Sequence, residues 1–546
     1  MRRHTHGWRL AGASVLTGLV VLAWAGLSEP GWPGSSAVAA AQGVPAGSPV
    51  PRAGGRAGVA GPAAPGAAVD AGRLPDQPAG ETPAQPREIP RRYPVDPGTF
   101  GRLKAAAAQA AAERDRGLGQ GVLPPPGPPP EFATVSYTGW NPPDAGLAVG
   151  PAHVLVVVNE SYSVYNRAGA RLSGPKSLGS LFGTTDSTFD PRALYDPAQG
   201  RFVVLSTAAS YLTLAVSQTG DPNGLWCTYR LVVDASGVTW SDYPGLGMDG
   251  DHLYVTTNQF ANADNSFRYA QLQAIPKASV YSGLATAGCP IATPLLFGAL
   301  ANPGGGNAFT VQPATQPDAR PGQSGPMHFV NAIWANGNNL AVRAITRATN
   351  GALLLDDPQW VASGYIAPYD LPADAPQPQG RNIDTGDTRL LGAVFRYGKI
   401  YAANTTLHVT GIAGATPNAF ANAQWYEITP NSLSDSFAAS HAVTSSTVAF
   451  FFPHVLPGCA SSPCASPSVV LEVSGTGRSR PASAFWTRGA SPTTYASGVS
   501  GYTLSSRWGD YAAVAADPAA TGPVWVLGEY AQSGGGWGTA ATSVSP

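Results

Sequence analysis

Short apolar stretches recur along the chain, and many of them begin at an aspartate and end at a turn of Gly, Pro or Asp. An aspartate, an apolar run, a turn and a second apolar run follow one another in five places: at Asp144, Asp190, Asp242, Asp387 and Asp510. Two apolar runs joined by such a turn predict a β-hairpin. The first copies are 46 residues (Asp144 to Asp190) and 52 residues (Asp190 to Asp242) apart, which is the spacing of a repeated unit.

Two further hairpins are predicted between these copies, over residues 327–347 and 452–475. Seven hairpin-led units in residues 131–546 predict an all-β fold, a seven-bladed β-propeller in which each blade repeats one environment around an axis. A sandwich also uses many short strands, but it does not require one hairpin repeated at intervals. The last unit has only three strands, and Glu131–Tyr137 is expected to supply the fourth by pairing the two ends of the domain.

Residues 1–130 differ in composition from the repeats. Residues 1–41 have a basic start, an apolar run over residues 10–27 and small residues before position 41, which indicate a cleaved secretory signal peptide. The run is long enough to leave an uncleaved membrane anchor open. Residues 42–95, rich in Ala, Gly and Pro, are expected to be disordered. Residues 96–118 are expected to form one Ala-rich helix, and residues 119–130 a stiff Pro-rich linker.

The charge balance and the cysteines set further limits. Only 12% of the 546 residues are charged and the net charge is −1, so no basic surface is available for nucleic acid. Four cysteines in an exported chain predict two disulfides. Cys459 and Cys464 flank a short loop and are expected to pair, which leaves Cys227 for Cys289. The mature protein is expected to be a secreted monomer, with association with the cell surface as the alternative. No membrane span is expected after signal cleavage.

Two distinctive blocks stand at the two ends of the repeats: PPDAGLAVGPAHVLVVVN (142–159) and RWGDYAAVAADP (507–518). Between them, in order, come AVSQTGDPNGLW (215–226), SDYPGLGM (241–248) and DTGDTRLLGAV (384–394). The set resembles a largely uncharacterised family of secreted bacterial propeller-like proteins with PPDxxxAVGPxH and RWGDY blocks. The chain departs from the family pattern at Ala152, where Asn is usual. The resemblance implies export and a propeller-like fold, and it implies no activity.

The repeated aspartates are the first candidates for chemistry. In a propeller, each would start the innermost strand of its blade, so the side chains would surround one mouth of the central channel. Each aspartate is expected chiefly to accept hydrogen bonds from its own turn. Arg partners or a bound Ca²⁺ are the alternatives that would offset grouped negative charge. No Ca²⁺-binding loop motif is present, and no cofactor is expected.

Arginines and aromatic residues stand beside the same strand starts. Arg192 and Arg389 lie two residues after an aspartate, and Arg507 lies three before one. Three guanidinium groups at a channel mouth would suit a sialidase, which holds a carboxylate with them. The aromatic residues at the strand starts are Trp140, Trp240, Tyr243, Trp508 and Tyr511. Such rings either stack on sugars or pack between blades, and packing is the commoner use.

The leading hypothesis is a non-enzymatic extracellular propeller that binds a glycan or a protein at this mouth. Its expected ligand-binding residues are Asp144, Asp190, Arg192, Asp242, Tyr243, Asp387, Arg389, Arg507, Trp508 and Asp510. No complete catalytic motif is recognised. One alternative is an extracellular glycoside hydrolase, sialidase-like or other, that uses channel carboxylates, with Glu472 and Glu529 as further candidates. The other alternative is a structural protein of the cell envelope.

Overall fold

The structure of the protein is a computed structural model. It describes residues 55–77, 87–115 and 132–546, except residue 209 and residues 282–287, 323–324, 362–364, 408–411, 413–419, 431–437 and 478–479. The predicted signal peptide (1–41) and the predicted linker (119–130) lie outside these residues. The described chain is mostly β, as predicted. Within it, no helix combines the length and the apolar character needed to cross a membrane.

Most strands form groups of four in which successive strands pair antiparallel. The first group contains β8 (Gly146–Val149), β9 (His153–Val158), β10 (Ser161–Asn166) and β11 (Arg171–Ser177). The second contains β12 (Thr188–Asp196), β13 (Arg201–Ala208), β14 (Tyr211–Ser217) and β15 (Leu225–Val232). The third contains β16 (Thr239–Met248), β17 (His252–Ala261), β18 (Phe267–Pro276) and β20 (Leu295–Leu300).

A ten-stranded sheet holds the next two groups, which are joined where β21 and β26 pair in parallel. One contains β21 (Gln312–Thr315), β22 (Met327–Ala332), β23 (Leu340–Arg347) and β24 (Leu353–Leu355), with β25 (Gln359–Trp360) beside β23. The other contains β26 (Leu390–Arg396), β27 (Lys399–Thr406), β28 (Asn422–Ile428) and β29 (Ala438–Val443).

Two more groups complete the C-terminal part. The first contains β30 (Val448–Gly458), β31 (Ser468–Gly477), β32 (Ala482–Thr487) and β33 (Thr493–Ala496). The last contains β34 (Ala513–Ala516), β35 (Val524–Ala531) and β36 (Trp537–Val544), with β6 (Ala133–Ser136) as its fourth strand. Because β6 pairs antiparallel with β36, the prediction that Glu131–Tyr137 completes the final sheet is confirmed.

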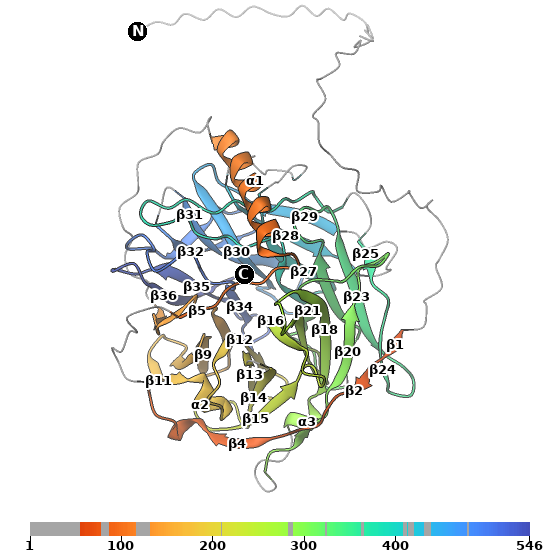
Figure 1. The fold of residues 1–546 in the computed structure, drawn as a ribbon. Coiled ribbons are helices and arrows are strands. Elements are labelled where there is room, and N and C mark those ends of the chain that lie inside the picture. The colour runs from red at the N-terminus through yellow and green to blue at the C-terminus, as the bar shows by residue number, and fades with distance from the viewer. Residues whose placement is uncertain are drawn as a thin grey trace, which may run out of the picture. The chain divides into compact units, whose positions relative to one another are not determined.

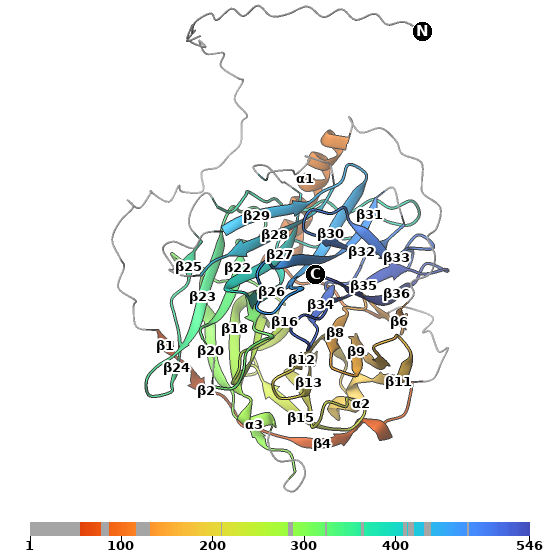
Figure 2. The ribbon, with the colours of Figure 1, turned by 180° about the vertical axis from the view of Figure 1, so that it is seen from behind.

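The groups surround one central cavity. Figures 1 and 2 show β12, β16 and β34 near the common centre, and β11, β15 and β20 farther out. The first strand of every group contributes residues to the wall of the cavity, from Leu147 on β8 to Val514 on β34. The apolar core lies between neighbouring groups, as where Leu205 and Leu214 pack with Val255 and Ile275. Strands buried on both faces explain apolar runs such as HVLVVV in β9.

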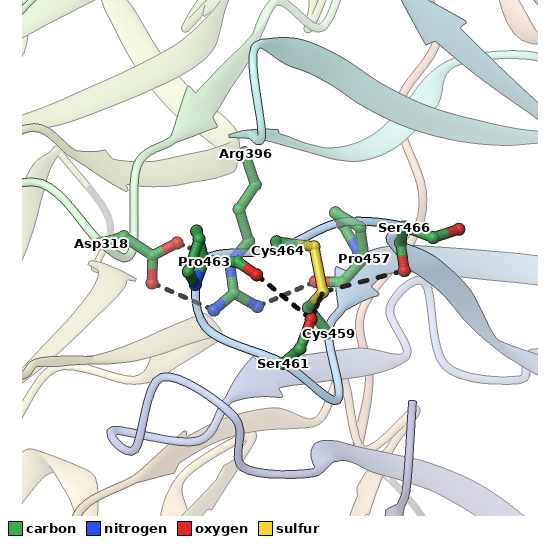
Figure 3. The surroundings of a disulfide bond; sticks show 8 residues. All are labelled: Asp318, Arg396, Pro457, Cys459, Ser461, Pro463, Cys464 and Ser466. Atoms are coloured by element: carbon green, nitrogen blue, oxygen red, sulfur yellow. Dashed lines mark hydrogen bonds and ion pairs between the residues drawn. A yellow bond between two sulfur atoms is a disulfide. The ribbon is translucent and has the colours of Figure 1, made fainter.

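Both predicted disulfides are present, Cys227–Cys289 and Cys459–Cys464. The second closes the loop after β30. Figure 3 shows it beside Arg396, whose guanidinium bridges Asp318 and the carbonyl oxygen of Pro457.

The expectation of disorder over residues 42–95 is wrong for the part that the structure describes. Residues 56–70 run along the outer edges of three groups as β1 (Arg56–Ala57), β2 (Val59–Ala60), β3 (Ala64–Pro65) and β4 (Ala67–Asp70). These strands pair with β24, β20, β19 (Ile291–Ala292) and β15. Backbone pairing to exposed sheet edges explains the order, since it does not require apolar side chains. The 3₁₀ turn η1 (Ala71–Arg73) follows.

The predicted Ala-rich helix is α1 (Pro97–Asp115). The prediction of a single helix missed α2 (Leu178–Phe182) and α3 (Ala278–Tyr281), which are too short to give a helical period in the sequence. Before α1, β5 (Arg87–Glu88) pairs in parallel with β7 (Trp140–Asn141).

Candidate functional site

A residue with a positive φ angle, in the left-handed backbone conformation, recurs before or near the start of the innermost strands. Asp144, Asp190 and Tyr243 have φ values of 49°, 54° and 53°, and Thr310 and Phe452 have 50° and 51°. In β12 and β16 the residue falls where pairing with the next strand shifts register. Such bulges re-aim side chains. The repeated distortion therefore explains how aspartates that are distant in sequence come to face one another.

The predicted aspartates do gather, and Asp384 joins them; we call Asp144, Asp190, Asp242, Asp384, Asp387 and Asp510 the acidic cluster. Asp510 lies at its centre. Arg507 donates from Nη1 to Asp510 Oδ1 at 2.8 Å and from Nη2 to Oδ2 at 3.1 Å. The backbone N–H of Asp510 donates to Asp144 Oδ1 at 2.7 Å, and Asn159 donates to Asp144 Oδ2 at 2.8 Å.

The three predicted arginines have separate partners and do not form one clamp. Arg389 donates to both carboxylate oxygens of Asp387 at 2.8 Å. Arg507 is held by Asp510. Arg192 donates to the carbonyl oxygen of Pro244 at 2.8 Å and lies over the Tyr511 ring, with Cζ 3.3 Å from its centroid. Because each arginine is bound to a different group, the three do not converge on one carboxylate, as a sialidase-like site requires.

Some carboxyl groups of the cluster have raised pKa values, so they keep a proton at a higher pH than an ordinary aspartate does. Burial, together with the charges of Asp242 and Asp510, raises the pKa of Asp190 to about 7. Burial also raises the pKa of Asp242 to about 6, although Arg389 opposes the shift. Burial and the charge of Asp510 raise the pKa of Asp144 well above its usual value.

Other carboxyl groups of the cluster stay ionised. Burial acts to raise the pKa of Asp510, but the guanidinium groups of Arg507 and Arg91 outweigh it and lower the pKa. Likewise Arg389 overcomes burial and lowers the pKa of Asp387. The cluster therefore holds protonated and ionised carboxyl groups in one network, the condition that allows one group to act as an acid and another as a base.

The chain's own residues 87–93 cover this cluster. The guanidinium of Arg91 contacts Asp510 and donates to Asp384 Oδ2 at 2.8 Å. The carbonyl oxygen of Arg92 accepts a hydrogen bond of 2.6 Å from Arg389. The Tyr93 ring lies under the Arg389 guanidinium, and burial raises its pKa beyond the range in which it ionises.

Helix α1 continues from this segment and adds a second cation. Lys104 donates to the carbonyl oxygens of Pro372 and Gly386 and lies 2.6 Å from Asp374 and 3.7 Å from Asp384. Together with Arg91 and Arg507, it lowers the pKa of Asp384 against the effect of burial. Asp384 thus depends on cations of the N-terminal segment more than the other acids do.

The aromatic residues divide into two kinds. Trp508 is 1% exposed, donates to Ser474 Oγ at 3.0 Å and packs edge-on against Tyr502, so it is a packing residue. Tyr243 and Tyr511 are buried against each other, and the Tyr511 hydroxyl donates to Asp190 Oδ2 at 2.9 Å. The prediction of packing between strand groups is confirmed for these three.

Trp140 and Trp240 have faces turned to the N-terminal segment. Arg87 lies over the Trp140 ring with Cζ 5.3 Å from the centroid, and Arg92 lies over the Trp240 ring at 5.8 Å. Arg91 likewise lies over the Phe452 ring, with Cζ 5.0 Å from the centroid. Three aromatic faces around the acidic cluster are therefore covered by guanidinium groups of one segment.

An open cavity of about 300 Å³ lies along the same strands beyond Arg192. Its wall is mainly small and apolar, with Gly146, Ala193, Gly392 and Ala513 among the lining residues. At the far ends of the strands, aspartates make turns and pair with cations. Asp517 Oδ1 accepts from the N–H of Ala519, and its other oxygen contacts Arg167.

Glu472 and Glu529, the further carboxylates named from sequence, are buried between strand groups. Burial raises the pKa of both well above the usual value. Tyr495 donates to Glu472 at 3.2 Å, and Glu529 accepts from the N–H of Gly509 at 2.8 Å. Both are packed against the backbone and neighbouring side chains, so neither offers an accessible carboxyl group.

The alternative of a bound Ca²⁺ has no support in the described part of the chain. There, no three His, Cys, Asp or Glu side chains are placed to hold a metal ion. Arginines and backbone N–H groups offset the acidic charge instead. Sequence reasoning missed Arg91, Tyr93, Lys104 and Asp384. The available signals were the RRY run before the Ala-rich helix and the first aspartate of DTGD.

No protein-family model and no curated protein matches the chain. Solved structures that match include the exo-β-1,3-galactanase from Phanerochaete chrysosporium with galactose (10% identity, 63% of this chain, 80% of that chain, TM-score 0.29). Others are the GH62 α-L-arabinofuranosidase catalytic domain from Coprinopsis cinerea (11%, 53%, 92%, 0.26) and the Synechocystis apocarotenoid oxygenase (10%, 69%, 78%, 0.29). These TM-scores are all below 0.5, so the likenesses do not indicate a function.

The hypothesis of a non-enzymatic propeller with an open binding face is corrected. Several of the matched structures are named as glycoside hydrolases, the class of the first alternative. The correction rests on the predicted face itself, which is not open, since Asp510 is 4% exposed and residues 87–93 lie over the cluster. The sequence-based reasoning overlooked that a charged segment of the same chain would fill an acidic mouth.

Proposed function

We propose that the protein is a glycoside hydrolase whose catalytic carboxyl groups belong to the acidic cluster. The observation that carries the proposal is the close grouping of carboxyl groups with pKa values pushed in opposite directions. Hydrolysis of a glycosidic bond needs one carboxyl group that gives a proton and one that accepts a proton or attacks.

We assign the acid role to Asp242 and the base role to Asp384. The raised pKa of Asp242 keeps it protonated in mildly acidic solution. Asp384 stays ionised, and its side chain is 17% exposed against 6% for Asp510. Asp510 and Asp387 are each held through two hydrogen bonds by an arginine, so they serve to orient and to offset charge.

The step balances as a hydrolysis. The Asp242 carboxyl group gives its proton to the glycosidic oxygen as the bond from that oxygen to the anomeric carbon breaks. A water oxygen forms the new bond to the anomeric carbon, and Asp384 takes the proton that this water loses. The leaving sugar keeps the former glycosidic oxygen as a hydroxyl, and the other sugar gains a hydroxyl from water at its anomeric carbon. Proton exchange with solvent then restores both carboxyl groups.

The aromatic faces suggest how a sugar is held. Trp140, Trp240 and Phe452 stand around the cluster, and each now receives an arginine of the N-terminal segment. Flat faces of this kind also stack on pyranose rings, which present C–H groups to them. We therefore expect a carbohydrate substrate to lie where residues 87–93 lie now.

The proposal includes the number of blades and the location of the protein. We propose seven blades, because seven first strands, β8, β12, β16, β21, β26, β30 and β34, contribute to one cavity wall. We also propose that the protein is exported and acts outside the cell as a monomer, since it carries two disulfides and the N-terminus resembles a signal peptide.

The test is hydrolysis of a polysaccharide panel, measured as new reducing ends. The full chain and its Arg91→Ala variant are assayed, and Asp384→Asn and Asp242→Asn are added to the Arg91→Ala background. Each Asn variant is expected to lower the rate by at least about a hundredfold, the usual contribution of acid–base catalysis. Asp318→Asn, at the opposite end of the strands, is the matched control and should keep the rate. No hydrolysis by any form on any polysaccharide would refute the proposal.

A further inference from the structure

The N-terminal segment has a second role beyond completing the fold. We propose that residues 87–115 are an inhibitory segment, which occupies the place of the substrate and leaves it when the enzyme is active. The inference rests on the proposed function. It is carried by the contacts that the segment makes, by the contacts that it does not make, and by what would remain after its departure.

The segment places its charges where the catalytic groups lie. Arg91 contacts Asp384 and Asp510, and its side chain is 3% exposed. It therefore neutralises the carboxylate that we assign as base and excludes water from it. Tyr93 is half-buried beside Arg389, and Arg92 covers Trp240. A sugar, a water molecule and this segment cannot occupy the same space.

The rest of the segment is held by few apolar contacts. Among the described side chains of α1, only Ala107 is buried, against Ala373 and Leu407, with Ala110 and Ala111 partly covered. Further contacts include the ion pairs and hydrogen bonds of Lys104, the Phe100–Trp334 ring contact and the hydrogen bond from Arg507 to the Ile89 oxygen. Two backbone bonds join Arg87 N–H to the Gly139 oxygen and Ile89 N–H to the Asn141 oxygen. Release of α1 therefore exposes little apolar surface, and salt screens the more exposed of the ion pairs.

The cluster keeps internal cations when the segment leaves. Asp510 still has both hydrogen bonds from Arg507, and Asp387 still has those from Arg389. Asp384 loses Arg91 and Lys104 and keeps Arg507, at 4.0 Å, as the cation that holds its pKa down. Departure thus frees the carboxylate that the reaction needs and leaves the Arg507–Asp510 and Arg389–Asp387 ion pairs intact.

Residues 56–70, which we call the strap, are bound in a different way. The strap only adds strands to the outer edges of sheets, where it pairs with β24, β20, β19 and β15. None of these pairs includes a residue of the acidic cluster. Residues 87–115 contact the cluster itself. This contrast supplies the matched control, since Arg73 lies just after residues 56–70, has an exposed side chain and pairs with Asp70 at 3.1 Å.

Hydrogen exchange on the full chain tests the inference. Arg91→Ala is compared with Arg91→Lys and with the control Arg73→Ala, and the amides of residues 87–93 are read against those of β35. In Arg91→Ala the segment amides should exchange at least about tenfold faster while β35 stays unchanged, because only the local opening becomes easier. Arg91→Lys should fall between, and Arg73→Ala should match the natural chain.

Hydrolysis by the same variants separates the two proposals. If the segment opens and the rate on the polysaccharide rises by about tenfold, both stand, because the competent fraction has grown. If the segment opens and no variant hydrolyses anything, the proposed function fails, and the inhibitory role fails with it. If the natural chain is fully active and Arg91→Ala adds nothing, the function stands and the inhibitory role is wrong.

A measurement on the natural chain covers the case in which Arg91→Ala does not fold. Exchange of the segment amides is followed at low and at about 1 M salt, where charges more than about 3 Å apart in water are screened. Faster exchange of residues 87–115 relative to β35 supports a detachable segment. Equal exchange of the two regions at all salt concentrations would show that the segment opens only with global unfolding, and would overturn the inference.

Discussion

The two ends of the innermost strands carry the same acidic residue in opposite situations. At the strand starts, Asp144, Asp190 and Asp242 share a buried space in which carboxyl groups outnumber the cations that touch them, and burial raises their pKa values. At the strand ends, each aspartate has its own turn or its own cation. Asp517 contacts Arg167, and Asp318 pairs with Arg396 at 2.6 Å.

The difference teaches that a repeated aspartate is not by itself a functional signal. Asp517 and Asp196 accept hydrogen bonds from backbone N–H groups two or three residues later, as turn residues do. Asp190 and Asp242 instead sit at bulges that direct them toward the centre. Local backbone geometry separates the two kinds, and a carboxyl group without a local partner acquires a shifted pKa.

The largest effect should come from removing charge at the strand starts. Asp510→Asn leaves Arg507 and Arg91 without their shared counter-charge in a buried place. Because an unpaired buried charge costs far more than the pair contributes, the free energy of unfolding should fall by about 3–5 kcal/mol. Urea denaturation followed by tryptophan fluorescence measures it. A loss below about 1 kcal/mol would mean that water reaches this end of the strands and that the two ends do not differ in burial.

The next effect concerns pH. The pKa of Asp190 is raised from 3.8 to about 7, so the folded state keeps a proton that the unfolded state loses as pH rises from about 4. Its contribution to stability is complete below pH 4 and is lost as pH rises through 7. Asp190→Asn removes this dependence, because the amide stays neutral and still accepts a hydrogen bond from the Tyr511 hydroxyl.

The natural chain should therefore lose more stability between pH 4 and pH 7 than the Asp190→Asn variant does. The difference is at most about 4 kcal/mol, from about 1.4 kcal/mol for each pKa unit. Thermal or urea unfolding at several pH values measures it. Parallel curves for the two proteins would show that Asp190 is ionised throughout, and the distinction between the two ends would lose its electrostatic basis.

Much of the fold follows from the sequence because its signals are local. Hairpin turns, apolar runs such as VLVVV in β9 and the pairing of Cys459 with Cys464 all lie within a few residues. The pairing of β6 with β36 followed from counting strands in the last group. The strap over residues 56–70 could not be predicted in this way, since it binds through backbone groups and its Ala, Gly and Pro residues resemble those of a disordered chain.

The candidate site was predicted only in part, for a related reason. The aspartates and arginines at the strand starts were recognised because they repeat with the hairpins. Arg91 lies outside every repeat, in a segment whose position depends on contacts with Asp384 and Asp510, 293 and 419 residues away. No pattern in the neighbourhood of Arg91 encodes those partners. Whether a mouth is open or filled is a tertiary property that local patterns do not contain.

The smallest effect should come from the same substitution at the strand ends. Asp318 lies opposite Arg396 with its side chain 54% exposed, and Arg396 also donates to the Pro457 oxygen at 2.8 Å, as Figure 3 shows. Water can replace the lost carboxylate, so Asp318→Asn should lower the free energy of unfolding by about 0–1 kcal/mol. The measurement is the urea denaturation used for Asp510→Asn, which makes the two Asp-to-Asn changes a direct comparison of the two ends. Equal losses at both ends would mean that burial does not distinguish them. A small loss here beside a large one at Asp510 would instead locate the electrostatic strain of the molecule at the strand starts, where the catalytic roles are assigned.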